Sequence, residues 1–303
     1  MPTFVTGRVE VSVPATSANL GPGFDSLGIA LGLRDVLTGE VTEGVDLALT
    51  VRGMGADEVP LDEGHLVYKA MCEAFSEMGC GVPGVRLHCE NVIPHSRGLG
   101  SSSAAIVGGI TLARALVAGG SLLMDDDAVF ALAARMEGHP DNVAPAFYGG
   151  FTIARCDQQR AFATTVAVDP RVRTVVFVPP DPVPTSVARG LLPDVIPHAE
   201  AADDAGRAAL LVVALSREPE LLLPATEDFL HQRYREPAMP DTLRLVGELR
   251  ASGVPAVVSG AGPSVLAFVD ASTESGVLER CPAGWRALSL PVDRNGAEIA
   301  GGA

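Results

Sequence analysis

Alternating and β-branched apolar residues predict β-strands in the first third of the chain, at residues 9–13, 48–52 and 85–91. A further apolar run, 174–178, predicts a strand that ends at a cluster of prolines. Apolar residues at helical spacing predict helices at 64–78, 102–118, 126–135, 205–216 and 240–252. Strands and helices do not alternate regularly, so the pattern favours an α+β fold.

Proline clusters at 179–184 and 193–197 punctuate the middle of the chain. Such clusters favour turns and interrupt helices and strands. We therefore expect a domain boundary shortly before them, with an N-terminal domain over residues 1–160 and a C-terminal domain over 161–303. A chain of 303 residues is long enough for two domains that each bury a core.

The longest apolar run, 104–124, approaches the length that crosses a bilayer. Arg114 and several glycines interrupt it, so we expect a buried helix that ends near Gly119. The first residues lack the charged and apolar regions of a signal peptide. The five cysteines form neither a Cys-x-x-Cys pair nor a disulfide framework, which favours reduced thiols and a cytoplasmic protein.

Charge narrows the classes of partner that this chain can bind. Against 22 Lys and Arg residues stand 37 Asp and Glu, which gives a formal net charge of -15. Nucleic acids and anionic membranes are bound by surplus Lys and Arg, so we expect neither as a partner. An anionic ligand must then be held by a few local donors.

A glycine and serine loop at 94–105 can supply those donors, because it runs directly into an apolar helical segment. Glycines let backbone N–H groups approach an anion, and the helix N-terminus adds partial positive charge. The loop is no P-loop, since the only lysine of the chain, Lys69, lies elsewhere. It is no dinucleotide fingerprint either, since Ser103 stands at the third glycine position. The alternative is an ordinary helix N-terminus with Ser and Gly caps.

Further glycine-rich segments at 14–25, 137–150 and 257–265 resemble tight turns when each is taken alone. The first carries one amide and one carboxylate. The second packs four polar or ionisable residues among Gly and Pro, which suits a rigid active-site loop. Together with the loop at 94–105, these segments indicate one shared site.

The chain resembles the homoserine kinases, a family of the GHMP kinase superfamily, over nearly its whole length. Residues 98–102, Gly-Leu-Gly-Ser-Ser, resemble the ATP loop of the superfamily, and 260–263, Gly-Ala-Gly-Pro, its third motif. The runs 15–25 and 139–145 are similar to homoserine kinases in particular, with support from 231–240. The resemblance implies a two-domain GHMP kinase fold. Its N-terminal domain is ribosomal-protein-S5-like, with a left-handed βαβ crossover and an ATP site, and its C-terminal domain is ferredoxin-like.

This resemblance implies an ATP-dependent, Mg²⁺-dependent phosphorylation of the side-chain hydroxyl of L-homoserine in the pathway to threonine, by a homodimer. It implies nucleotide contacts at Pro94, Arg97, Gly98, Leu99, Gly100, Ser101, Ser102, Ser103 and Ala104. It also implies that the third motif contributes Gly260, Ala261 and Gly262.

The resemblance further implies a role for each polar residue of the glycine-rich segments. Ser102 and Glu137 correspond to the Mg²⁺ ligands. At the substrate, Asn19 and Asp25 correspond to the residues at its amino end, and Arg189 and Arg235 to its carboxylate clamp. The residues beside the reacting hydroxyl are His139, Asp141 and Asn142. The chemistry asks for the same residue types. A zwitterionic amino acid needs a carboxylate for its ammonium group and a guanidinium group for its carboxylate.

Two alternatives to this function stay open on the sequence. One is a kinase of the same superfamily that acts on another small hydroxy amino acid or alcohol, signalled by Asp203 and Asp204 where homoserine kinases commonly have Phe-Asn. The other is a non-catalytic ligand-binding member of the fold. The presence of Ser102, Glu137 and Asp141 together argues against it, because a silent module has no need of metal ligands.

Overall fold

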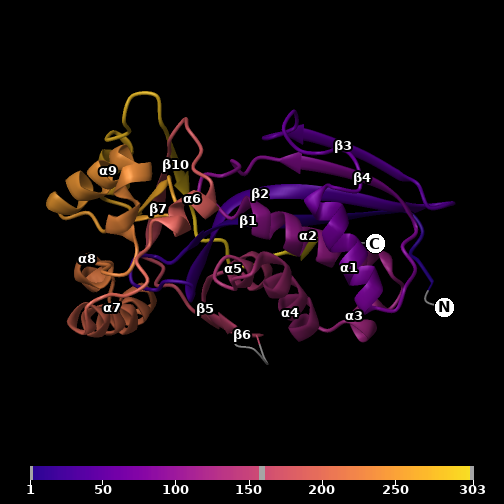
Figure 1. Cartoon of the computed structure of the whole chain (residues 1–303), viewed down its shortest axis with the longest axis horizontal. Helices are drawn as coiled ribbons and strands as arrows, with labels where there is room; N and C mark the ends of the chain where they lie inside the picture. Colours follow the sequence, from indigo (N-terminus) through magenta and orange to yellow (C-terminus); the bar gives the residue numbers. More distant parts are fainter. Residues whose placement is uncertain (1–2, 157–160, 301–303) are drawn as a thin grey trace.

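The computed structural model describes residues 3–156 and 161–300, and two β-sheets organise this part of the chain (Figure 1). Residue 160, where the sequence predicts the domain boundary, lies outside the described residues. The chain passes from the first sheet to the second between β6 and β7, and its last strand, β11, belongs to the first sheet again. The boundary itself stays a prediction.

The first sheet has the order β11-β1-β2-β4-β3, and β5 and β6 extend it from the start of β2. Its strands are β1 (Arg8–Ala18), β2 (Leu27–Thr42), β3 (Leu47–Gly53), β4 (Gly84–Asn91), β5 (Phe151–Cys156), β6 (Ala161–Val166) and β11 (Glu298–Ile299). Strands β3 and β4 are parallel, and α1 (Leu66–Glu77) connects them. The predicted strands at 9–13, 48–52 and 85–91 are therefore confirmed.

Helices cover one face of this sheet (Figure 1), and α2 (Ser101–Leu116) lies at their centre in contact with α1, α4 and α5. The others on this side are α3 (Gly120–Leu123), α4 (Asp126–Glu137) and α5 (Val143–Tyr148). Glycine at 109 permits the close packing, because a Cβ atom there would lie 2.4 Å from the carbonyl oxygen of Val67 on α1. The apolar run 104–124 thus lies mainly in the buried helix α2, which ends three residues before Gly119, and the rest of the run includes the short helix α3, where Leu122 and Leu123 are exposed. Across the described ranges, none of the helices has the length and apolar character that a bilayer crossing needs.

The second sheet has the order β10-β7-β9-β8, formed by β7 (Arg173–Val178), β8 (Ala256–Val258), β9 (Val265–Val269) and β10 (Arg286–Leu290). Side chains of β7 alternate between two apolar clusters, with Val176 in the larger cluster and Val175 in the smaller one. This alternation follows from the period of two in a strand. One face of the second sheet therefore contributes to the larger cluster, which it shares with the first sheet, and its other face forms the smaller cluster.

Helices of the second half pack around this sheet. They are α6 (Thr185–Gly190), α7 (His198–Ser216), α8 (Leu222–Ala225), α9 (Pro240–Ala251) and α10 (Glu274–Leu278), with 3₁₀ helices η1 (Pro219–Leu221) and η2 (Gln232–Ala238). The predicted helices at 205–216 and 240–252 are confirmed, although α7 begins seven residues earlier than its apolar pattern does.

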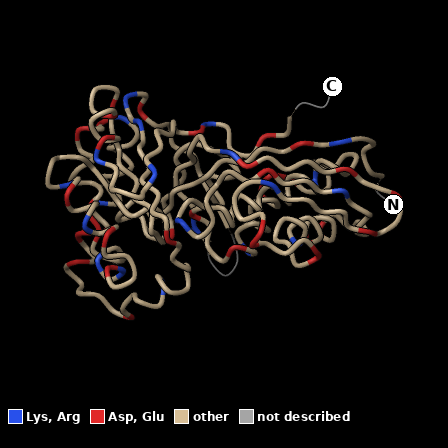
Figure 2. Tube along the Cα trace, turned by 90° about the horizontal axis from the view of Figure 1, so that it is seen from above, with Lys and Arg blue, Asp and Glu red and all other residues tan. Residues whose placement is uncertain are grey.

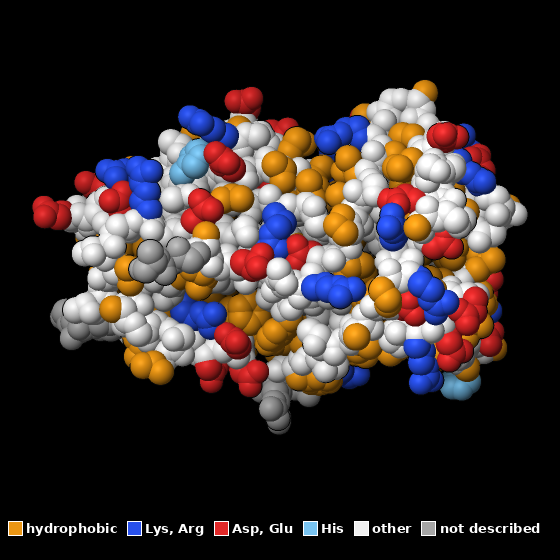
Figure 3. All heavy atoms as spheres, turned by 180° about the vertical axis from the view of Figure 1, so that it is seen from behind, with side chains coloured by type: hydrophobic (Ala, Val, Ile, Leu, Met, Phe, Trp, Pro, Cys, Tyr) orange, Lys and Arg blue, Asp and Glu red, His pale blue; other side chains and the backbone are white. Residues whose placement is uncertain are grey.

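Lys and Arg are interspersed with Asp and Glu along the whole trace in Figure 2. The face of the molecule in Figure 3 mixes both signs of charge with hydrophobic side chains. Neither view therefore offers a broad basic surface on the described residues. The absence of nucleic-acid and membrane partners stays a prediction.

The loop before α2 contacts the turn between β8 and β9, so the two sheets meet at the site. Gly98 has a φ of +71°, and a Cβ atom there would lie only 2.1 Å from the carbonyl oxygen of Ser259. The hydroxyl of Ser259 donates a hydrogen bond to the Gly98 carbonyl at 2.6 Å. Only glycine combines this backbone conformation with this close approach.

We expect Gly98→Ala to destabilise the protein by about 2–4 kcal/mol, because a positive φ and a steric overlap add together. The matched control is Gly253→Ala, since Gly253 has a φ of +84° and open space around its missing Cβ. That variant should lose only about 1 kcal/mol. Urea unfolding of both variants measures the difference, and equal losses would contradict the proposed close approach.

Candidate active site

Helix α2 points its N-terminus into a cavity where the two sheets meet. Its N-cap is Gly100, in the left-handed conformation at φ +69°, where a Cβ atom would lie 1.9 Å from Oγ1 of Thr16. The first intrahelical bond of this turn runs from the N–H of Ala104 to the carbonyl of Gly100. The N–H groups before Ala104 therefore have no acceptor within the helix, and they face the cavity with the positive end of the helix dipole. This arrangement can hold a phosphate group.

One carboxylate, Glu137, lies beside this helix N-terminus at the end of α4. Ser102 donates a hydrogen bond to its Oε2 at 2.7 Å, and Ser103 donates to its Oε1 at 3.0 Å. These hydroxyl and carboxylate oxygens are hard donors of the kind that Mg²⁺ takes. Clusters of three or more His, Cys, Asp and Glu side chains arranged for a metal are absent from the described residues. The site therefore fits an ion that keeps waters and phosphate oxygens as its other ligands, as Mg²⁺ does in kinases.

The segment after Glu137 forms a hydrogen-bonded group next to the same cavity. Nδ1 of His139 lies 2.7 Å from Oδ1 of Asp141, which also accepts a hydrogen bond from the backbone N–H of Asn142 at 3.1 Å. The amide oxygen of Asn142 accepts a hydrogen bond from Thr16 on β1 at 2.8 Å. Burial lowers the pKa of His139, but the hydrogen bond to Asp141 and the charges of Asp141 and Glu137 outweigh it, so the pKa is raised overall. His139 is therefore protonated more readily than a free histidine.

The loop between β1 and β2 lies opposite α6 and carries the predicted ammonium-binding residues. Asn19 donates to the carbonyl oxygen of Gly260 at 2.9 Å and accepts from the backbone N–H of Asp25 at 2.9 Å, so it fixes this loop to the third motif. Asp25 forms a bidentate ion pair with Arg189, at 2.7 and 3.2 Å. Both side chains of the pair are 37% exposed. A pair this exposed stabilises the fold by no more than about 1 kcal/mol, so a ligand can replace it at small cost.

Arg235 is buried to 1% exposure at the wall of the cavity, which is rare for a guanidinium group. Its Nη1 donates to the carbonyl of Gly260 at 2.8 Å, whereas its Nε has no hydrogen-bond partner among the described residues. Burial and the nearby Arg189 lower the pKa of Arg235 to about 10, against the opposing charges of Asp228, Asp25 and Asp141. The side chain is thus a charged donor at neutral pH.

Neighbouring Arg233 points outward and pairs with Glu200 on α7, so its guanidinium group is about half exposed. Arg235, which the resemblance assigns to the carboxylate clamp, thus lies at the cavity wall, whereas Arg233 does not. Both Arg189 and Arg235 lie within 6.0 Å of the ring of Phe24. The ring gives the two guanidinium groups one common face to pack on.

The lining of this cavity includes every residue predicted to bind nucleotide, metal or substrate except Asp25, Ser103, Ala104 and Gly262. Each exception is close behind the wall. Asp25 bonds to Arg189 and Ser103 to Glu137, while Ala104 lines the neighbouring cavity and Gly262 packs on Met239. The structure also adds Thr185, one turn before Arg189 on α6. A single threonine within a proline-rich segment gives no signal that sequence reasoning can use.

Arg97 has a different environment from the one its predicted nucleotide role suggests. Its side chain donates to the carbonyl oxygens of Pro179, at 3.1 Å, and of Pro180. A third bond runs to the carbonyl of His95 at 3.0 Å. These contacts tie the loop to the first proline cluster, so Arg97 holds the position of the loop in this structure.

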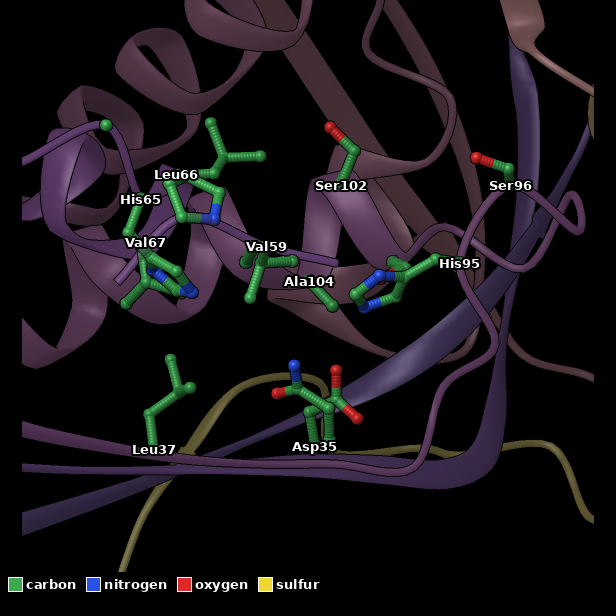
Figure 4. Close-up of a pocket in the computed structure, with 15 residues that line it drawn as sticks. Asp35, Leu37, Val59, His65, Leu66, Val67, His95, Ser96, Ser102 and Ala104 are labelled. Carbon is green, nitrogen blue, oxygen red and sulfur yellow. The ribbon is translucent and has the colours of Figure 1, made fainter. Parts of the chain in front are cut away.

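A second cavity of about 290 Å³ adjoins the first and shares Ser96, Ser101 and Ser102 with it. In Figure 4 the side chains of His65 and His95 enter it from opposite sides, with apolar side chains between them. Burial lowers the pKa of both histidines, so both are neutral at pH 7. The slot is lined mainly by apolar side chains, together with the two histidines and Asp35, whose carboxyl group accepts hydrogen bonds from the backbone N–H groups of Val92 and Ile93. A mostly apolar slot with a few polar groups suits an aromatic ring such as a nucleobase.

The phosphate-binding helix N-terminus, the acidic residue beside it and the two-sheet fold together define a GHMP kinase. The family model for the GHMP kinases N terminal domain matches residues 65–150. A homoserine kinase from Streptomyces coelicolor is 51% identical over 98% of this chain and 96% of its own, and one from Clavibacter michiganensis is 50% identical over 96% and 94%. The chain belongs to the homoserine kinase family.

Solved structures agree with this assignment at the level of fold. The structure of a homoserine kinase from Cytophaga hutchinsonii has a TM-score of 0.86 at 22% identity and covers 98% of this chain and 99% of its own. A mevalonate kinase from L. major has a TM-score of 0.71 at 15% identity, with coverage of 97% and 99%. The two-domain GHMP kinase fold expected from the sequence is therefore confirmed.

We expect Asp141→Asn to lower the pKa of His139, because the variant removes the charged acceptor that favours the imidazolium form. The pair stabilises the wild-type fold fully below the ordinary histidine pKa of about 6.5, and this stabilisation disappears as pH rises through the raised pKa. NMR titration measures the shift, with His139→Gln to assign the resonance among the 6 histidines. An unchanged pKa in Asp141→Asn would contradict the pairing.

Proposed function

We propose that this kinase transfers the γ-phosphoryl group of ATP to the side-chain hydroxyl of L-homoserine and forms O-phospho-L-homoserine in threonine biosynthesis. The observation that carries the proposal is one cavity that combines a phosphate-binding helix N-terminus with the buried guanidinium group of Arg235 and the Asp25–Arg189 pair. The first part suits a nucleotide and the second suits an amino-acid zwitterion. Membership of the homoserine kinase family supports the same substrates.

ATP occupies both cavities in this proposal. The backbone N–H groups from Gly98 to Ser103 hold its phosphates, with Pro94, Leu99, Ala104 and the third motif as the surrounding wall. Its base enters the slot between His65 and His95, which adjoins the loop. Support comes from the shared lining of the two cavities at Ser96, Ser101 and Ser102, since a nucleotide must extend from one to the other.

Mg²⁺ is held by Ser102 and Glu137 in this proposal. Their oxygens lie 2.7 Å apart beside the helix N-terminus, and hydroxyl and carboxylate donors fit this ion. When bound, the ion neutralises charge on the phosphates during transfer. The hydrogen bond from Ser103 to Glu137 fixes the orientation of the carboxylate.

The substrate zwitterion binds by exchanging partners with the Asp25–Arg189 pair. Arg235 and Arg189 take the substrate carboxylate, and Asp25, fixed by Asn19, takes the ammonium group. Each charge of the protein pair then has an opposite charge from the ligand, so no buried charge is left alone. Support comes from the partial exposure of the pair and from the spare Nε donor of Arg235.

Asp141 orients the substrate hydroxyl and does not act as a strong general base in this proposal. Its Oδ1 already accepts hydrogen bonds from His139 and from the backbone N–H of Asn142, so this oxygen is engaged within the protein. Phosphoryl transfer passes through a loose transition state in most analyses, so early removal of the hydroxyl proton gains little. His139 and Asn142 complete the surroundings of the hydroxyl.

The alternatives from the sequence receive little support. Asp203 is exposed on α7, and Asp204 is buried away from the cavity lining, so neither residue signals another substrate. Ser102, Glu137 and Asp141 lie together, as catalysis requires. The proposal includes a homodimer in the cytoplasm, for which the support is the family resemblance and the use of ATP.

We expect Ser102→Ala and Glu137→Gln to lower kcat by a hundredfold or more while ATP still binds. Loss of metal-mediated charge neutralisation costs several kcal/mol at the transition state, whereas the backbone contacts to the phosphates remain. Coupled ADP release and calorimetric ATP titration at saturating Mg²⁺ measure the two effects. Glu77→Gln is the control, because Glu77 pairs with Arg135 on the surface. Near-normal turnover in both site variants would contradict the metal assignment.

We expect Arg235→Lys to lower kcat/KM for homoserine by about tenfold or more, roughly 1.4 kcal/mol, with little change for ATP. Lysine keeps the charge but lacks the planar fork that matches a carboxylate. Arg233→Lys is the matched control, because Arg233 lies two residues away and faces solvent. A homoserine analogue without its carboxylate should react similarly with all three proteins. If Arg233→Lys were the impaired variant, the assignment of the clamp would be wrong.

A further inference from the structure

Two buried carboxyl groups lie together behind the substrate end of the cavity, outside the machinery described so far. Asp204, on α7, is 2% exposed, and the side chain of Asp228, in the loop before η2, is fully buried. The two side chains adjoin, because Asp204 accepts a hydrogen bond from the backbone N–H of Phe229, the residue after Asp228, at 2.9 Å, and hydrogen bonding with Asp228 raises the pKa of Asp204. Two carboxylates cannot form such a bond, because neither has a proton to donate. The two groups can therefore share a hydrogen bond only while one of them carries a proton.

Asp228 holds the start of the segment that leads to Arg235. Its carboxylate accepts hydrogen bonds from the backbone N–H groups of Leu230 at 2.9 Å, His231 at 3.2 Å and Gln232 at 2.7 Å. These N–H groups lie at the N-terminal end of a helical turn, where acceptors are otherwise missing. These three bonds give the N–H groups the acceptors that they otherwise lack, so Asp228 fixes the start of the segment.

This capped segment connects directly to the substrate residues. The buried ring of His231 lies 2.8 Å, through Nε2, from the carbonyl oxygen of Gly21 and packs on Phe24 at a centroid distance of 5.2 Å. Gln232 accepts from the backbone N–H of Val258 on β8 at 2.6 Å. One turn on, Arg235 reaches Gly260 and the face of Phe24. A movement of the segment would therefore move Arg235 and the loop that carries Asp25.

The charges around the pair decide which carboxyl group is protonated. Arg235, on η2, and His231 both face Asp228, and Arg235 needs a nearby negative charge because it is buried. Asp204 accepts a hydrogen bond from the backbone N–H of Phe229 at 2.9 Å, and Arg207 on its own helix, whose charge opposes the rise of its pKa, is already paired with Glu227. Asp25 is the other acidic group that faces the segment. The proton is accordingly favoured on Asp204.

We propose that Asp204 is a positioning residue for the amino-acid substrate, and that it acts as a protonated donor to Asp228, whose carboxylate fixes the segment from His231 to Arg235. The proposal rests on homoserine as the substrate of the cavity. Burial raises the pKa of Asp204 to about 6, and the charge of Asp228 raises it as well. The donor is thus present at low pH and is lost as pH rises through this value, after which two carboxylates repel each other behind the clamp.

The test compares Asp204→Asn with the wild type across pH 5.5–8. Asparagine keeps the shape of a protonated aspartate and donates a hydrogen bond at every pH. The ratio of homoserine KM in the wild type to that in the variant should be near one at pH 5.5 and reach about fivefold at pH 8, a usual size for coupling between sites. The ratio cancels the titration of His139 and of the substrate, which both proteins share. The KM for ATP should not differ.

Asp203→Asn is the matched control, because it removes the same charge from the neighbouring exposed position on α7. It should follow the wild type at every pH. Asp204→Ala lacks the donor altogether, so its homoserine KM should be raised throughout the range. The Tm, measured without substrate, should show wild type and Asp204→Asn alike at pH 5.5 and the wild type less stable at pH 8.

The protonated pair would be overturned if neither the KM ratio nor the difference in Tm between wild type and Asp204→Asn changed between pH 5.5 and pH 8. If the Tm difference changed with pH but the homoserine KM ratio did not, the pair would affect only stability, and the positioning role would be overturned. If Asp204→Ala does not fold, the Asn variant and its control still decide the question. Failure of the proposed function would appear differently, as absence of homoserine phosphorylation in the wild type while the Tm comparison still reports on the pair.

Discussion

The unsatisfied N–H groups at the start of α2 are the constraint on which the site depends. A helix end that faces a cavity needs an acceptor, and the fold leaves this one open toward its ligand. Several close approaches keep the end in place: Gly100 meets β1, Gly98 meets the β8–β9 turn, and Gly109 lets α1 pack against the middle of the helix. At each of these positions the glycine has no side chain, so its backbone can approach the neighbouring element directly. The helix is thereby fixed relative to both sheets, and Glu137 can be placed beside it with its orientation set by two serine hydroxyls.

Charge compensation organises the other half of the cavity. A buried guanidinium group such as that of Arg235 costs several kcal/mol unless negative charges and acceptors surround it. Asp25, Asp141 and Asp228 supply those charges from three separate segments, and Gly260 supplies a carbonyl acceptor. In the proposed substrate complex, Asp25 belongs to the ammonium site and Asp141 to the hydroxyl site, while Asp228 caps the turn behind the clamp. One buried cation thus couples substrate binding, hydroxyl orientation and the packing of η2, which explains why the acidic and basic residues of the site cannot be considered singly.

The two cavities differ in chemistry as their ligands do. The slot between His65 and His95 is mostly apolar, with the two histidines and Asp35 as polar groups (Figure 4), whereas the adjoining cavity is rich in backbone donors and paired charges. Their common wall is the start of α2. A nucleotide that spans both therefore places its terminal phosphate on the side where the amino acid binds. This division explains how a protein with a formal net charge of -15 binds two anionic groups, because the field that matters is local and is supplied by backbone and by two arginines.

The sequence by itself determined the local parts of this protein: the glycine-rich loop before a helix, the buried apolar helix α2, several strands, and the residue types that a zwitterion and a nucleotide require. These follow from backbone conformation and side-chain chemistry within a few residues, and both are properties of a short stretch. The long strand β2 escaped prediction, because residues 27–31 are all buried, on both faces of the sheet, and only the later part of the strand alternates between buried and partly exposed positions. Only the tertiary structure decided that Arg235 faces inward while Arg233 pairs with Glu200, that Asp25 meets Arg189, and that Asp204 is buried against Asp228. The orientation of Arg235 depends on the geometry of an irregular 3₁₀ helix, which its local sequence does not specify. The other two contacts join segments far apart in the chain, and sheet pairing and core packing bring these segments together.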